Sequence, residues 1–180
     1  LTQFDAEAVF VGHGIHAPEF QWDDYKGVDV RGKAVVLFTN EPDSKDAKLF
    51  GGRALTYYGR WTYKYEEANR RGAAAVIIIH TTPTAGYGWN VVRNSWAREQ
   101  PYVALGPGEP ALAFAGWITA EAAAKLLAGS GRTVLAGEGS VAPEHPVWVE
   151  FAHSMAPMMA PVAGPLGEIV LRARRGPLRL

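Results

Sequence analysis

The 180-residue sequence contains no cysteine, which excludes disulfide scaffolds, thiolate zinc sites and cysteine nucleophiles. It also lacks an excess of either charge, because 18 Lys and Arg residues balance 18 Asp and Glu residues. Nucleic-acid-binding proteins usually carry a basic excess, so this balance argues against a nucleic-acid partner. The sequence has no apolar run that approaches the roughly 18 residues of a membrane-spanning helix, and we therefore expect no membrane span.

Hydrophobic residues make up 48% of the chain and charged residues 20%, a balance typical of a folded domain rather than of a disordered chain. The composition changes near Val141, after which Lys, Asp, Asn and Tyr no longer occur. We therefore expect one domain over residues 1–140 and an atypical Pro/Ala/Arg-rich tail over residues 141–180. The tail is either a divergent native segment, a disordered one or a misjoined coding end. From Met155 onward its prolines predict loose packing without regular strand pairing.

The hydrophobic pattern predicts a mixed α/β fold. Apolar runs of strand length occur at residues 8–15, 34–38, 73–79 and 112–118. Between the second and third runs, residues 61–71 show helical periodicity, since Trp61, Tyr65 and Ala68 recur on one face. This order of strand, helix and strand predicts a βαβ unit. A second helix is expected over residues 120–127, with Thr119 as its N-cap.

The sequence contains none of the catalytic motifs considered below. None of the serines stands in a Gly-x-Ser-x-Gly elbow, and Gly12-His13-Gly14 lacks the third glycine of a dinucleotide-binding loop. His13-x-x-His16 is too short for the zinc-binding pair of a metalloprotease helix. We therefore expect no catalytic residue, metal site or cofactor in this chain. A weaker hypothesis is an enzyme that uses His80, which lies at the end of a predicted strand, together with Asp or Glu partners.

Two pairs of adjacent acidic residues have structural interpretations. Glu66 and Glu67 lie mid-helix, each with an arginine four residues on, which favours a salt-bridged solvent face over a metal site. Asp23-Asp24, flanked by Trp22 and Tyr25, is typical of a turn or cap.

Aromatic residues gather on the long loop that precedes the first predicted helix, roughly residues 41–59. Long loops with many apolar groups are often functional, and this one is expected to pack against its own domain or a neighbour. Arg60 lies at the helix N-terminus, where a cation gains nothing from the helix dipole. We expect it to contact a substrate carboxylate or carbonyl, or else a local acid such as Glu41 or Asp43. The candidate substrate-shaping residues are Tyr57, Tyr58, Arg60, Trp89 and Asn90.

Several motifs together resemble a known domain. They are Phe10-Val-Gly-His-Gly-Ile15, Trp22-Asp-Asp-Tyr-Lys-Gly-Val-Asp-Val30, Leu55-Thr-Tyr-Tyr-Gly-Arg-Trp61, Arg71-Gly-Ala-Ala-Ala-Val-Ile-Ile-Ile-His80 and Ala115-Gly-Trp-Ile-Thr119. The combination, over about residues 7–130, is similar to the protease-associated (PA) domain inserted in zinc-dependent exopeptidases of the aminopeptidase and glutamate-carboxypeptidase type. His13 stands where that family often has an aromatic Tyr.

The resemblance implies an open β-barrel-like or β-sandwich domain with a βαβ element and short helices. It also implies a non-catalytic role: covering the active-site cleft of a secreted or periplasmic peptidase and shaping peptide access, with zinc held only in the parent catalytic domain. The expected partners are that catalytic domain in cis and the peptide substrate. An alternative is an autonomous module that binds peptides or proteins through its aromatic loop surface.

Overall fold

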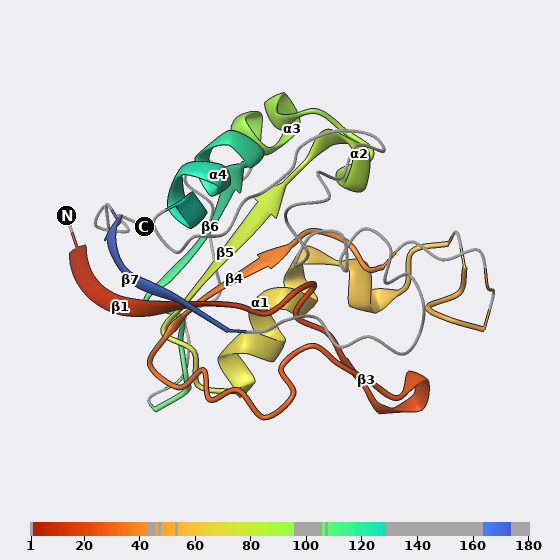
Figure 1. Ribbon diagram of the computed structural model, residues 1–180, viewed down its shortest axis with the longest axis horizontal. Coiled ribbons are helices and arrows are strands. Elements are labelled where there is room, and N and C mark those ends of the chain that lie inside the picture. The colour runs from red at the N-terminus through yellow and green to blue at the C-terminus, as the bar shows by residue number, and fades with distance from the viewer. Residues whose placement is uncertain are drawn as a thin grey trace.

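The computed structural model describes residues 2–42, 46, 48–52, 54–95, 106, 108–128 and 164–173. A five-stranded sheet forms the centre of the molecule, with the strand order β6-β5-β4-β1-β7 (Figure 1). Its strands are β1 (Thr2–Phe10), β4 (Ala34–Phe38), β5 (Ala75–His80), β6 (Phe114–Thr119) and β7 (Gly164–Ala173). The first four run parallel, and β7 pairs with β1 in the antiparallel direction.

Helices and a small second sheet surround this centre. The antiparallel pair β2 (His16–Ala17) and β3 (Trp22–Asp23) forms the second sheet. The α-helices are α1 (Trp61–Arg70), α2 (Thr82–Ala85), α3 (Trp89–Asn94) and α4 (Ala120–Ala128). Two short 3₁₀ helices, η1 (Pro18–Phe20) and η2 (Tyr57–Gly59), lie in the connections.

The sheet separates two apolar layers because successive strand residues point to opposite faces. In β4, Val35 and Leu37 belong to the cluster that includes Ala68 of α1, whereas Val36 and Phe38 belong to the cluster that includes Ala123 of α4. All five residues of β4 are buried. Helices thus cover both faces of the sheet, α1 on one and α4 on the other (Figure 1).

The mixed α/β class and the βαβ unit β4-α1-β5 are confirmed. Thr119 caps α4 as expected, since its hydroxyl accepts the backbone N–H of Ala122 at 3.2 Å. In its described part the sheet is open, with β6 and β7 as its edges, and it does not close into a barrel. None of the described helices is both long and apolar enough to cross a membrane.

The expectation of no regular pairing from Met155 onward is wrong for residues 164–173, which form β7 along β1. Pro165 is compatible with this strand because β7 lies at the sheet edge, and because Pro165 faces Val9 beside a register shift. The rest of the tail, residues 141–163 and 174–180, lies outside the described residues. The proposed division near residue 140 stays a prediction.

Candidate functional site

The loop before α1 packs on its own domain, as one of the two sequence alternatives proposed. Phe50 is fully buried and Leu49 nearly so, in a cluster with Ile15, Ala17 and Tyr63. The last part of the loop, Leu55–Arg60, carries three of the candidate residues and is called the aromatic loop below.

The aromatic loop exposes apolar groups while several of its backbone groups are hydrogen-bonded. Thr56 caps η2, since its Oγ1 accepts the backbone N–H of Tyr58 at 3.2 Å. Leu55 is 62% exposed and Tyr57 52% exposed, and both are among the large exposed hydrophobic residues of the described chain. Arg60 is exposed at the N-terminus of α1. A hydrogen-bonded segment with exposed aromatic, aliphatic and cationic groups is suited to peptide contacts.

The two tyrosines of the loop have different positions. Tyr58 is half-buried, and its ring packs edge-on against Tyr63 and Phe50, with centroid distances of 5.0 and 6.0 Å. Its hydroxyl donates to Glu19 at 2.6 Å, and this hydrogen bond raises the pKa of Tyr58 to about 12. Tyr58 therefore anchors the loop, whereas Tyr57 lies at the surface and donates its hydroxyl to Glu66.

Two buried charged residues, Glu41 and Lys64, form hydrogen bonds with the aromatic loop. Glu41 is 7% exposed and accepts both the backbone N–H of Thr56, at 2.9 Å, and the Thr56 hydroxyl. Lys64 of α1 is completely buried, and its Nζ donates to the carbonyl of Tyr58 at 2.7 Å. Burial lowers the pKa of Lys64, while the negative charges of Asp24 and Glu41 act in the opposite direction.

The side chain of Asp24, which follows β3 in the chain, binds the glycine turn that follows β1. Its Oδ2 accepts the backbone N–H groups of His13 and Ile15, at 3.1 and 2.9 Å, and its Oδ1 accepts the Trp22 indole at 2.7 Å. Backbone N–H groups of a glycine turn after a strand form an anion site in many α/β folds. In the turn Gly12–Gly14 these donors already bind a carboxylate of the chain itself, so the turn serves structure and not an external phosphate.

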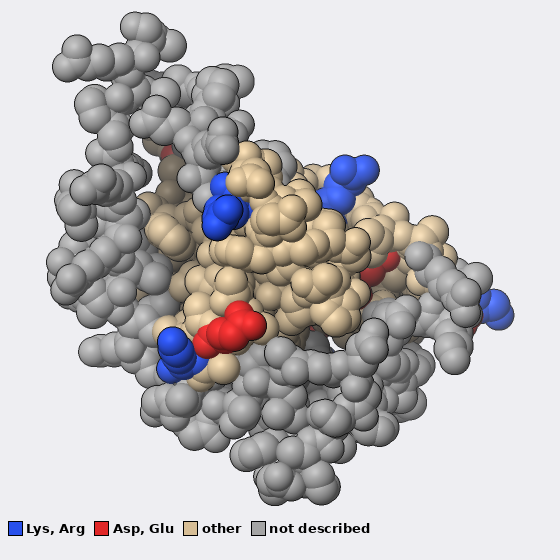
Figure 2. Space-filling view, turned by 90° about the horizontal axis from the view of Figure 1, so that it is seen from above, with Lys and Arg blue, Asp and Glu red and all other residues tan. Residues whose placement is uncertain are grey.

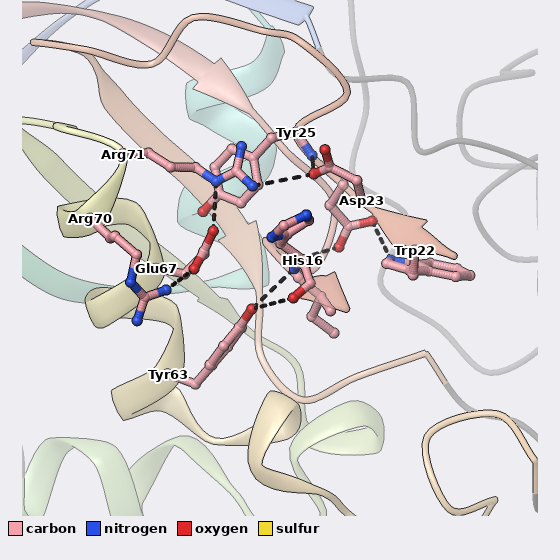
Figure 3. Close-up of polar contacts among 10 residues, drawn as sticks. His16, Trp22, Asp23, Tyr25, Tyr63, Glu67, Arg70 and Arg71 are labelled. Carbon is pink, nitrogen blue, oxygen red and sulfur yellow. Dashed lines mark hydrogen bonds and ion pairs between the residues drawn. The ribbon is translucent and has the colours of Figure 1, made fainter. Parts of the chain in front are cut away.

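The two pairs of adjacent acidic residues differ in how well the structure agrees with the sequence expectation. Asp23 accepts the backbone N–H of Tyr25 at 2.9 Å, which confirms the turn role. Glu67 binds Arg71 at 2.7 Å and also Arg70, but it is 4% exposed and not on a solvent face (Figure 3). The solvent-face expectation is wrong for Glu67 because α1 turns this side toward Tyr25.

The Arg71 guanidinium contacts both Tyr25 and Asp23. It stacks over the Tyr25 ring, with its Cζ 4.1 Å from the ring centroid, and it lies within 3.6 Å of Asp23 (Figure 3). Tyr63 links α1 to β2, because its hydroxyl accepts the backbone N–H of His16 at 3.0 Å and lies 3.2 Å from the His16 carbonyl. The first turns of α1 are thereby attached to the small sheet.

The other two candidate residues lie on a different element, α3. Trp89 packs against His80 at the end of β5, with 5.6 Å between ring centroids, and Asn90 is exposed next to it. Nε2 of His80 donates to the carbonyl of Tyr87 at 3.0 Å, and the imidazole is also in contact with the Tyr87 and Trp117 rings. Within the part of the chain that the structure describes, the contacts of the His80 imidazole are with a carbonyl and aromatic rings. None of them is the Asp or Glu partner that the enzymatic hypothesis needs.

Arg60 does not pair with Glu41, one of the two local acids that the sequence suggested. Within the described ranges no hydrogen bond or ion pair engages its guanidinium, and the Glu41 carboxylate binds Thr56. The other suggested acid, Asp43, lies outside the described residues. Sequence reasoning missed Lys64 and Leu55. Lys64 lies on the same helical stripe as Trp61, Tyr65 and Ala68, a spacing that is compatible with burial but does not establish it for a charged side chain.

The described residues contain no group of three or more His, Asp and Glu side chains arranged to hold a metal ion. Figure 2 shows Lys and Arg side chains scattered singly over the visible described surface, without a broad patch of one charge. The interactions described above for these residues are ring contacts, hydrogen bonds and ion pairs. Comparisons with known protein families, with curated proteins and with solved structures find no match to this chain.

Proposed function

We propose that this chain is a non-catalytic accessory domain of the PA type, which covers the active-site cleft of a zinc-dependent exopeptidase and shapes the access of peptides. The sequence motifs in residues 7–130 support this proposal. The observation that carries it is the aromatic loop, whose backbone is attached to buried residues while Leu55, Tyr57 and Arg60 remain exposed.

The chemistry of the loop fits a peptide. Leu55 and Tyr57 offer apolar contact area, and the planar Arg60 guanidinium suits a carboxylate or a backbone carbonyl. Tyr58 contributes by holding the loop and not by direct contact. Trp89 and Asn90 are proposed as a separate edge of the same peptide-facing surface. Zinc and bond cleavage belong, on this proposal, to the catalytic domain of the parent protein.

The test uses the full-length natural protein that contains this chain. We expect it to hydrolyse peptides in a zinc-dependent reaction, and the 180-residue chain alone to hydrolyse none. Arg60→Ala in the full-length protein should lower kcat/KM about tenfold, or about 1.4 kcal/mol, without a change in thermal stability. Arg31→Ala is the matched control, because Arg31 is an exposed arginine whose partner is Asp29.

Three results would contradict the proposal. They are peptide hydrolysis by the isolated chain, absence of peptidase activity in the full-length protein, and an Arg60→Ala variant with unchanged kinetics. The alternative function, an autonomous peptide- or protein-binding module, rests on the same exposed loop. It predicts that the isolated chain binds peptides by itself and that Arg60→Ala weakens this binding.

A further inference from the structure

A completely buried lysine is costly unless other groups compensate its charge. Lys64 lies in the first half of α1, where an alanine or leucine would satisfy the apolar stripe. Its burial therefore needs a reason in the surrounding structure. The hydrogen bond that the structure gives to its Nζ goes to the backbone carbonyl of Tyr58, in the middle of the aromatic loop.

The charge of Lys64 interacts electrostatically with titratable groups from three separate connections. Asp24 comes from the turn after β3, Glu41 from the segment after β4, and His13 from the turn after β1. The two carboxylates stabilise the ammonium group, and the ammonium group in turn disfavours protonation of His13. The hydrogen bond from Lys64 to the Tyr58 carbonyl therefore lies in a region where carboxylates from outside α1 compensate the charge of the lysine.

Glu41 contacts the same loop at two other points. It accepts the backbone N–H and the hydroxyl of Thr56, where the loop enters η2. It also lies directly under Gly59, because a Cβ added at Gly59 would be 3.3 Å from Glu41 Oε2 and 3.1 Å from Leu55 Cδ2. Lys64 and Glu41 together contact the start, the middle and the end of η2.

We propose that Lys64 and Glu41 are positioning residues that hold the aromatic loop in one conformation, in which Tyr57 and Arg60 are preorganised at the surface. Preorganisation reduces the entropy lost when a loop binds its ligand, so it strengthens binding without adding a contact. The identity of the ligand, a peptide, rests on the proposed function. The fixed conformation of the loop does not, and it can be measured without any ligand.

Amide hydrogen exchange of the 180-residue chain, resolved by residue, tests this directly. The informative amides are those of Gly59 and Arg60, which donate to the carbonyls of Thr56 and Tyr57. Glu41→Ala removes the acceptor of the Thr56 N–H and hydroxyl but leaves the Thr56 cap of η2 in place, whereas Thr56→Val removes the hydroxyl bound to Glu41 together with that cap. In both variants we expect these amides to exchange at least about tenfold faster than in the wild type. Amides of β4 and β5 should be unchanged, because the core is not altered.

Three further variants complete the design. Lys64→Met should accelerate the same loop amides, and the Glu41 and Thr56 variants carry the test if this protein does not fold. Thr56→Ser retains the hydroxyl and should restore wild-type exchange. Thr62→Val is the matched control, since Thr62 lies just beyond the loop and makes no recorded side-chain hydrogen bond in the described structure.

The outcomes separate the positioning role from the proposed function. Unchanged loop exchange in Glu41→Ala, or equal acceleration of the loop and of β4 and β5, would overturn the positioning role. Local acceleration with unchanged peptide kcat/KM in the full-length protein would leave the positioning role supported and would contradict the proposed function. Local acceleration together with a raised KM and an unchanged kcat would support both.

Discussion

The carboxylate of Asp24 accepts the backbone N–H of Ile15 at 2.9 Å, and both residues are completely shielded from solvent. This contact joins the turn after β1 to the turn after β3. Burial raises the pKa of Asp24, and its hydrogen bonds and the Lys64 charge oppose that effect. The chain thus uses its own carboxylate to satisfy the backbone donors of the glycine turn, in the place where other folds bind a ligand.

Asp24→Asn tests the importance of this carboxylate. Asparagine has one acceptor oxygen, so its NH₂ group must face either the Trp22 indole or the two backbone N–H groups, all of which are donors. We predict a loss of about 1.5–3 kcal/mol in the free energy of unfolding, the value of a hydrogen bond to a charged group. Urea denaturation measures it. Asp29→Asn, at an exposed pair with Arg31, should have a much smaller effect, and equal effects would contradict this prediction.

Gly14 is restricted by its backbone and by its neighbours at once. Its φ is +63°, and an added Cβ would lie 2.7 Å from Leu37 Cδ2 in the core. Gly27 has a φ of +79° with nothing within 4 Å, so Gly27→Ala measures the conformational cost alone, about 1–2 kcal/mol. We predict that Gly14→Ala destabilises the protein clearly more than Gly27→Ala in thermal melts. Equal shifts in Tm would show that Leu37 moves aside without cost.

The central strands should dominate stability. Ile78 of β5 is completely buried in the layer beneath α1, and Ile78→Ala should cost about 2–5 kcal/mol because it leaves a cavity. Val91→Ala on α3, where the side chain is 45% exposed, should change stability by less than about 0.5 kcal/mol. Urea melts of both variants provide the comparison. A cost under about 0.5 kcal/mol for Ile78→Ala would contradict the assignment of the core.

His13 should make the protein sensitive to acid. Burial lowers the pKa of His13 to about 3, and its Nδ1 lies 3.2 and 3.1 Å from the carbonyls of Thr39 and Asn40. Between about pH 6.5, the usual histidine pKa, and pH 3 the unfolded chain binds a proton that the folded protein excludes. Stability is therefore fully present above about pH 6.5 and is lost as the pH falls, by at most about 1.4 kcal/mol per pH unit.

His13→Asn is the comparison for this pH dependence, because its amide NH₂ still donates to the same carbonyls and does not titrate. Urea midpoints from pH 7 to pH 3.5 should fall more steeply in the wild type than in the variant. Carboxylates titrate in both proteins and cancel in the difference. Parallel curves would mean that the imidazole accepts a proton in the folded state.

Much of the fold was predictable because its signals are local. The β-branched apolar runs of β4 and β5, the helical stripe of α1 and the Thr119 cap each depend on residues a few positions apart. The strand β7 was not predictable in this way. Pro165 and the prolines that precede it argue against pairing, and only the place of β7 at the sheet edge beside β1 makes Pro165 acceptable.

For the candidate site, residue type and spacing alone indicate which segment carries aromatic groups and where the glycine turns lie. They do not indicate which charges are buried. Lys64 and Glu67 are residue types that usually lie on the solvent-facing side of a helix. Asp24 is a residue type that usually lies in an exposed turn. Their burial depends on partners from other elements, namely the Tyr58 carbonyl, the Arg71 guanidinium and the amides of the turn after β1. These groups come together only in the folded protein. A charged side chain can be buried only where hydrogen-bond partners and opposite charges compensate the loss of hydration, and here those partners come from other elements.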